Sequence, residues 1–154
     1  MDQSKLDFLQ KDFIAKLKSL QADAAGSWGR MNGQQMVEHF IDAVELAYGK
    51  IPARLLTPPE NLGKMQAFVL SDIPFKENTK NPLMGETPAP LKYPDMATAV
   101  AKLEGALKEL VATFTAEPGK KAMNPFFGEL DFAGQVHLLH KHAIHHLTQF
   151  KLYP

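Results

Sequence analysis

Five of the six histidines of this 154-residue chain lie in one ten-residue stretch, HLLHKHAIHH, from His137 to His146. Within it, only His142 and His146 are four residues apart. At about 100° per residue, an α-helix places two such side chains on one face, one turn apart. Leucines share that face, and imidazoles among leucines need partners for their nitrogens. A metal ion is one such partner.

Two helical histidines at this spacing form half of a site for zinc and other borderline divalent ions, and a third ligand can come from elsewhere. The remaining histidine, His39, lies near the edge of the apolar face of another expected helix. We therefore predict a site for a divalent ion, zinc or nickel, formed by His39, His142 and His146. Three histidines leave positions open for water, as in catalytic sites. Because the ligands must be neutral, metal affinity should fall as the pH drops through the ordinary histidine range, about 6.5.

The other histidines of the stretch have simpler interpretations. By helical angle, His137 and His140 lie on the far side from His142 and are expected to be solvated. His145 lies about 60° from the His142 face and is expected to be a neighbour of the site rather than a ligand. The pattern HxxxH by itself is also compatible with a solvated helix.

Two further residues are candidates for a catalytic role. Asp42 follows His39 by three residues and could act as a base or accept a hydrogen bond at the site. Gln149 follows His146 by three residues and could bond an imidazole nitrogen or a metal-bound water. Glu38 is expected to point about 100° away from His39.

Four amphipathic segments are expected to position these residues. The repeat of apolar side chains predicts helices over residues 4–20, 33–48, 95–117 and 131–150, with Asn32, Asp95 and Asp131 at or near their N-termini. A shorter helix begins at Pro58-Pro59-Glu60, and no alternating strand pattern is found. Nearly fifty residues separate the second and third long helices, which allows these two to run parallel. We predict a single all-α domain over 1–154, a four-helix bundle with one long crossover.

The connections contain two features of interest. The Pro- and Asn-rich segment 73–94 is either a lid or a plain crossover. Trp28, Met31, Phe126 and Phe127 lie near the expected bundle ends and are interpreted first as caps of the core, with a pocket wall as the alternative.

Composition excludes several classes of function. Seventeen basic residues balance seventeen acidic ones, so the surplus of Lys and Arg that nucleic-acid binding requires is absent. Neither a membrane span nor a secretory signal is recognisable, and we expect a cytoplasmic protein with no membrane partner. There is no cysteine, which excludes thiolate ligands. Ala143 occupies the general-base position of a zincin HExxH motif, and no GxSxG, GxGxxG or P-loop pattern occurs.

Three stretches of the sequence resemble the DinB/YfiT-like superfamily, and the most similar branch has no assigned function. They are WGRMNGQQMVEH (28–39), NPFFGEL (124–130) and HAIHHLTQF (142–150), and the resemblance extends over essentially the whole chain. It implies a four-helix bundle with one long crossover and a divalent metal held by three histidines, which fall on His39, His142 and His146. The superfamily motif HxxxHRxQ reads HAIHHLTQ here, with Leu147 in place of the arginine.

The resemblance implies more than one activity, since some members are similar to metal-dependent thiol transferases or maleylpyruvate isomerases and others to hydrolases. We expect a metal-dependent enzyme acting on a small molecule, in which the ion activates water or a thiol. The alternatives are a non-catalytic metal- or small-ligand-binding protein and a homodimer with a vestigial site. An open coordination position beside an apolar pocket would favour the enzyme, and a fourth ligand such as Asp42 would favour a structural ion.

Overall fold

The computed structural model describes residues 1–79, 81, 84–85 and 87–154 and is mostly helical. Its elements are α1 (Gln3–Asp7), the π-helical turn η1 (Phe8–Phe13), α2 (Ile14–Lys18), α3 (Gly33–Ala47), α4 (Pro59–Leu70), α5 (Met96–Ala116), β1 (Ala122–Asn124), β2 (Gly128–Leu130) and α6 (Phe132–Gln149). The expected helical class is therefore confirmed. In the described part of the chain, no helix combines the length and hydropathy required to span a bilayer.

Side-chain caps define where the three longest helices begin. The Asn32 side chain accepts a hydrogen bond from the Gln35 backbone N–H at 2.8 Å, and the Gln35 side-chain oxygen accepts one from the Asn32 backbone N–H at 2.9 Å. Asp95 and Asp131 likewise cap α5 and α6 through the backbone N–H three residues on. Such caps satisfy backbone donors that have no partner inside the helix. The predicted starts of these helices are confirmed.

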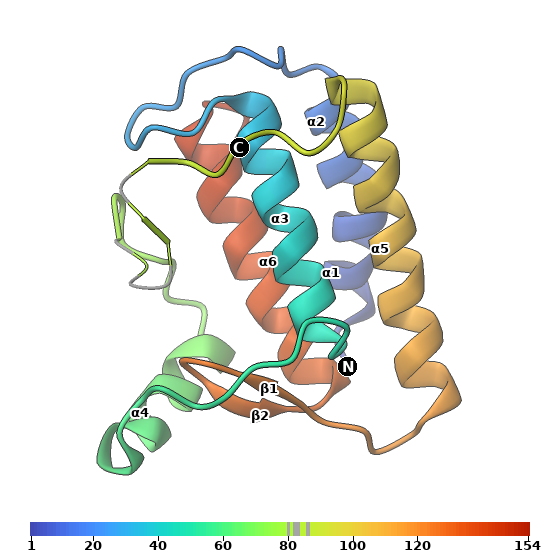
Figure 1. The fold of residues 1–154 in the computed structure, drawn as a ribbon. Coiled ribbons are helices and arrows are strands. Elements are labelled where there is room, and N and C mark those ends of the chain that lie inside the picture. Colours follow the sequence, from blue (N-terminus) through green and yellow to red (C-terminus); the bar gives the residue numbers. More distant parts are fainter. Residues whose placement is uncertain (80, 82–83, 86) are drawn as a thin grey trace.

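The continuous helical segment 3–18 lies side by side with α3, α5 and α6 (Figure 1). In this view α3 and α5 run in the same direction, as the long connection between them allows. The space between the helices is filled by a single large cluster of buried side chains, which includes Phe13, Phe40, Leu103, Leu139 and Leu147. The rings of Phe13 and Phe40 meet edge to face with centroids 4.8 Å apart. This packing fixes α6 against α3 and therefore the histidines against one another.

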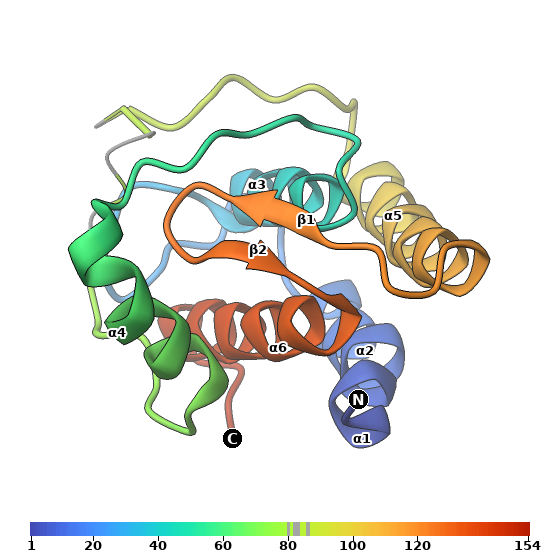
Figure 2. The same cartoon turned by 90° about the horizontal axis from the view of Figure 1, so that it is seen from below.

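A short β-hairpin corrects the expectation that the chain contains no strand. β1 and β2 pair antiparallel, with Met123 opposite Glu129, and lie at one end of the helices near α3 and α6 (Figure 2). The Asn124 side chain accepts hydrogen bonds from two backbone N–H groups of the turn, and Gly128 adopts a positive φ of 78°. Strands of three residues are too short to show alternation, so the sequence pattern did not predict them.

The helix α4 packs beside α6 and the hairpin through a second, smaller cluster that includes Val69, Phe127 and Leu138. Lys141 of α6 is 8% exposed and donates hydrogen bonds to the carbonyls of Ser71, at 2.9 Å, and Ile73. Burial lowers the pKa of this lysine. A cation at the C-terminal end of a helix complements the carbonyl groups there. Lys141 therefore holds the end of α4, and the start of the next connection, against α6.

Glu38 holds the other end of that connection. Its buried carboxylate accepts hydrogen bonds from the backbone N–H of Lys92, at 2.7 Å, and of Tyr93, at 3.3 Å. The side chain of Gln34 donates a third at 3.1 Å. The α4–α5 connection is thus tied to α6 at its start and to α3 at its end, so that it crosses the face on which these two helices meet.

Candidate metal centre

Three histidines from two helices meet inside the protein. His39 comes from α3, and His142 and His146 come from successive turns of α6. Each offers one nitrogen, and these three nitrogens lie within 4.8 Å of one another. The Nε2 atom of His142 is 3.1 Å from Nε2 of His39 and 2.7 Å from Nε2 of His146. In the described part of the chain, no other group of His, Asp or Glu side chains meets the same requirement.

Gln149 determines which nitrogen of His146 faces this cluster. The Gln149 amide nitrogen donates a hydrogen bond to the Trp28 carbonyl at 2.9 Å, so its oxygen faces Nδ1 of His146, 2.7 Å away. Nδ1 of His146 must then carry the proton and donate it, which leaves Nε2 of the neutral ring with a free lone pair. This is the arrangement in which a histidine binds a metal through one nitrogen and is oriented through the other.

Hydrogen bonds among the three imidazoles cannot account for both short nitrogen–nitrogen contacts. With Nε2 of His146 unprotonated, His142 can donate its Nε2 proton to it, but the same atom then has no lone pair for His39. One of the two short nitrogen–nitrogen contacts is therefore left without a hydrogen bond. A divalent cation accepts all three lone pairs, and nitrogens bound to one tetrahedral zinc ion lie roughly 3.4 Å apart, given Zn–N distances of about 2.0–2.1 Å. The donor set fits such an ion, and the three side chains lie close enough to bind it.

Burial keeps these imidazoles neutral. It lowers the pKa of His39 to about 4 and that of His146 to about 3, and it lowers the pKa of His142 well below the usual value. Removal from water is the main cause in each case, because an imidazolium is poorly solvated in an apolar site. The ligand set is therefore ready for a cation at neutral pH. Protons should therefore compete with the ion only at a pH below the value of about 6.5 that the sequence predicts.

Gln149 has space at this position because two glycines lie opposite it. A Cβ on Gly26 would come within 2.9 Å of the Gln149 Cγ, and one on Gly29 within 3.1 Å of its amide nitrogen. Gly29 also has a φ of +75°, which side-chain-bearing residues rarely adopt. The loop before α3 is thus shaped around the side chain that orients His146.

Asp42, the other candidate for a catalytic role, lies at the edge of the site. Its carboxylate is 3.2 Å from Nζ of Lys92, and its negative charge raises the pKa of His39 against the larger effect of burial. It does not belong to the group that could hold the metal. The structure therefore provides no carboxylate as a fourth ligand within the described residues.

The remaining histidines of α6 lie outside the cluster. Nδ1 of His137 is 3.0 Å from Nζ of Lys5, and the His140 ring packs on Phe8, both on the side facing α1 and η1. His145 packs between Trp28 and Phe75, with ring centroids 5.4 and 5.9 Å away. Its ring is 5.3 Å from that of His146, so it is a neighbour of the site, as its helical angle indicated.

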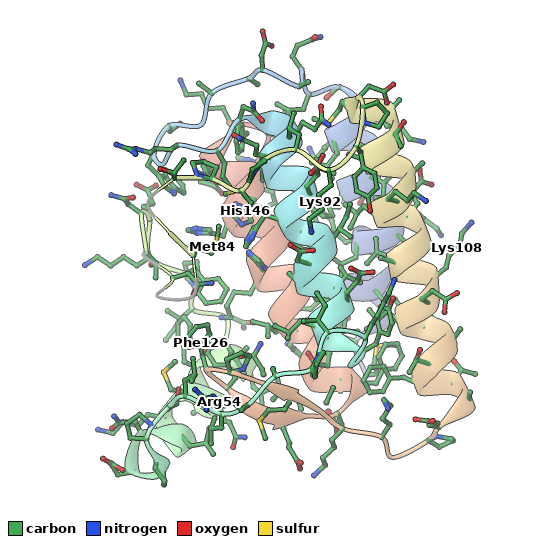
Figure 3. The ribbon with its side chains drawn as sticks, viewed as in Figure 1. Arg54, Met84, Lys92, Lys108, Phe126 and His146 are labelled. Carbon is green, nitrogen blue, oxygen red and sulfur yellow. The ribbon has the colours of Figure 1, made fainter. Side chains whose placement is uncertain are left out.

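A cavity of about 1580 Å³ opens directly over the three histidines. Its wall includes aromatic and aliphatic side chains from α3, α4, α6 and the connections: Trp28, Met31, Leu46, Met65, Phe68, Phe75, Phe126, Phe127, Leu138 and Leu139. In Figure 3, His146, Met84, Phe126 and Arg54 follow one another along one side of the helices. Trp28, Met31, Phe126 and Phe127 therefore line the cavity, as in the pocket-wall interpretation. Met31, Phe126 and Phe127 also pack against the buried clusters, as in the core-cap interpretation.

The segment 73–94 contributes to the same cavity. Ile73, Pro74 and Phe75 line it at one end of the segment, and Lys92 lines it at the other. The Phe75 ring is 6.3 Å from that of His142, centroid to centroid. The segment therefore covers the histidines rather than passing far from them. Residues 80, 82–83 and 86 within it lie outside the described part of the chain.

Comparison with known proteins found no counterpart of this chain: no family model, no curated protein and no solved structure matches it. The resemblance to the DinB/YfiT-like superfamily accordingly stays a prediction from the sequence motifs.

Replacing Gln149 by Ala should weaken metal binding about 10- to 100-fold, because His146 loses the hydrogen bond that fixes its tautomer and orientation. The Gln149→Glu variant, which retains an acceptor oxygen, should recover part of the affinity. Competition with a chromogenic zinc chelator measures both. An unchanged affinity in Gln149→Ala would show that His146 is oriented by its packing alone.

Proposed function

We propose that this chain is a DinB/YfiT-like four-helix bundle with one long crossover, and a divalent-metal-dependent enzyme that acts on a small molecule by hydrolysis or thiol transfer. His39, His142 and His146 would hold the ion, zinc or nickel. The observation that carries the proposal is that the three-histidine cluster opens onto a large, mostly apolar cavity. Among the described residues, no carboxylate belongs to the cluster. Binding sites for small molecules have this composition, a mostly apolar wall with a few polar groups.

When bound, the ion would supply Lewis acidity and lower the pKa of a hydroxyl or thiol group that binds to it. The chain's own residues have separable tasks. Gln149 is engaged on both sides of its amide, so it orients His146 and does not act on substrate. Asp42 lines the cavity beside His39, and it is the carboxylate that we propose for proton transfer. Phe75 packs near His142, and Trp28 lines the cavity beside His145, so these two rings would shape the apolar space next to the ion.

A non-catalytic role has one specific observation in its favour. The three histidines come from two helices, so an ion between them would join α3 to α6. Such an ion would raise the stability of the fold without any reaction, because anything that binds only the folded state stabilises it. The same cavity would then serve to bind a ligand rather than to convert it.

The experiment is a comparison of metal-free, zinc-loaded and nickel-loaded protein on a panel of ester and amide hydrolysis and thiol-conjugation reactions. The enzyme proposal predicts turnover that requires the ion, is lost in His142→Ala and is retained in His140→Ala, whose ring lies on the opposite side of α6. A protein that gains thermal stability with zinc or nickel but shows no metal-dependent turnover on the panel would contradict the enzyme and support the structural alternative.

A further inference from the structure

The cavity over the histidines carries a positive charge that the neutral chain as a whole does not. Arg30, in the connection before α3, Arg54, in the connection before α4, and Lys76, in the connection after it, all line the cavity and are exposed. None of the three forms an ion pair with a described residue. Three separate connections thus each bring one unpaired cation to the same opening.

On the described part of the cavity wall, negative charge is compensated by a lysine, while Glu77 acts on His145 from outside the wall. Among the described residues that line the cavity, Asp42 is the one carboxylate, and it is paired with Lys92, the fourth cation. Net charge of the chain is zero, so the local excess of cations reflects how the connections converge rather than overall composition. Cavities lined by charge of one sign raise the local concentration of ligands of the opposite sign.

The rest of the wall is apolar and suits a ligand of considerable size. The volume of about 1580 Å³ exceeds the 300–1,000 Å³ of typical ligand sites, roughly. Phe68, Phe75, Phe126 and Phe127 provide aromatic surface within it, and in Figure 3 Arg54 and Phe126 lie on the same side of the molecule as His146. An apolar body and an anionic group can therefore be accommodated together.

We propose that the cavity binds an amphipathic organic anion. Its apolar body would pack against the phenylalanines, and its anionic group, a carboxylate or a similar oxyanion, would pair with a cation of the wall, Arg30, Arg54 or Lys76. The inference that this anion is the substrate rests on the proposed function. The inference that the cavity binds it does not require the ion. Arginine is suited to the task because its planar guanidinium matches the geometry of carboxylates and related anions.

The test uses two fluorescent probes with the same aromatic body, the anion anilinonaphthalene sulfonate and the neutral phenylnaphthylamine. Trp28, the single tryptophan of the chain, lines the cavity and serves as the energy-transfer donor to a bound probe. Titrations are done on the metal-free and the zinc-loaded protein. The variants are the triple replacement Arg30→Gln, Arg54→Gln, Lys76→Gln and the control Lys108→Gln, which removes an exposed lysine of α5 on the other side of the molecule (Figure 3).

The sulfonate probe should bind more tightly than the neutral probe, and its affinity should fall with added salt. The triple variant, which removes every candidate cation, should lose up to about tenfold in affinity for the sulfonate, since exposed ion pairs contribute modestly, and should bind the neutral probe unchanged. Lys108→Gln should match the wild type for both probes. Equal affinity of the two probes, or a triple variant that binds the sulfonate like the wild type, would overturn the proposal.

The outcome is separable from that of the proposed function. Preference for the anionic probe in protein that binds no metal would support this inference and contradict the enzyme proposal. Metal-dependent turnover without any preference for the anionic probe would support the enzyme proposal and contradict this inference. The replaced side chains are exposed, so the fold of the variants can be confirmed by an unchanged circular dichroism spectrum.

Discussion

Replacing His142 by Ala, or His146 by Ala, is expected to abolish stoichiometric binding of zinc or nickel. Each change removes one of only three nitrogens that converge, and it also breaks the pair that α6 presents on adjacent turns. His39→Ala should weaken binding strongly but leave the α6 pair intact. Isothermal titration of the metal-free variants with zinc measures the loss of affinity. For the two α6 variants it should be at least about 100-fold, because removing a group that only orients a ligand already costs about 10- to 100-fold.

The chain provides matched controls for this experiment on the same helix. His137→Ala and His140→Ala remove imidazoles that contact Lys5 and Phe8 on the far side of α6, so both variants should bind zinc like the wild type. If these two variants lose the metal while His39→Ala retains it, the assignment of the three ligands is wrong.

The metal-free protein should lose stability as the pH falls from 7 to 5. Burial holds the pKa of His39 in the folded state at about 4 and that of His146 at about 3, well below the ordinary histidine value of about 6.5. At a pH between the folded and the unfolded pKa, these imidazoles are protonated in the unfolded chain and neutral in the folded chain. The free energy of unfolding therefore decreases as the pH is lowered. The stabilisation is fully present above about pH 6.5 and is lost progressively below it. Each imidazole contributes at most about 1.4 kcal/mol per pH unit, a slope approached toward pH 5, where the unfolded chain is protonated and the folded chain is not.

Urea denaturation at a series of pH values between 7 and 5 tests this expectation, in a range that lies above the usual titration of carboxylates. His39→Gln keeps a polar side chain that does not titrate, so its stability should depend less steeply on pH than that of the wild type. The other imidazoles of α6 shift in the same direction and contribute to the slope that remains. A wild-type stability that is flat between pH 7 and 5 would show that the three histidines are solvated and not buried.

Local features made much of the fold predictable. The starts of α3, α5 and α6 follow from Asn32, Asp95 and Asp131, whose side chains bond the backbone within three residues. The hairpin was not predictable, because its two strands of three residues carry no period and depend on the turn at Asn124 and on packing against α4.

The convergence of the three histidines was predictable, since helical angle places His142 and His146 on one face and His39 is the one histidine on another helix. The surroundings of the site were not. Glu38 and Lys141 hold the α4–α5 connection across the histidines, and each does so through backbone groups more than fifty residues away in the sequence. The cations at the cavity arise from the same long-range placement of connections, which neither composition nor periodicity reveals.

X-ray absorption at the zinc or nickel edge tests the central claim most directly, on wild-type protein that has been loaded with one equivalent of the metal. The three-histidine site predicts one ion per chain and three imidazole nitrogens, at about 2.0–2.1 Å if the ion is zinc. The multiple scattering of three imidazole rings should disappear in His142→Ala. Binding of much less than one equivalent, or a first shell of oxygen without imidazole scattering, would contradict the account.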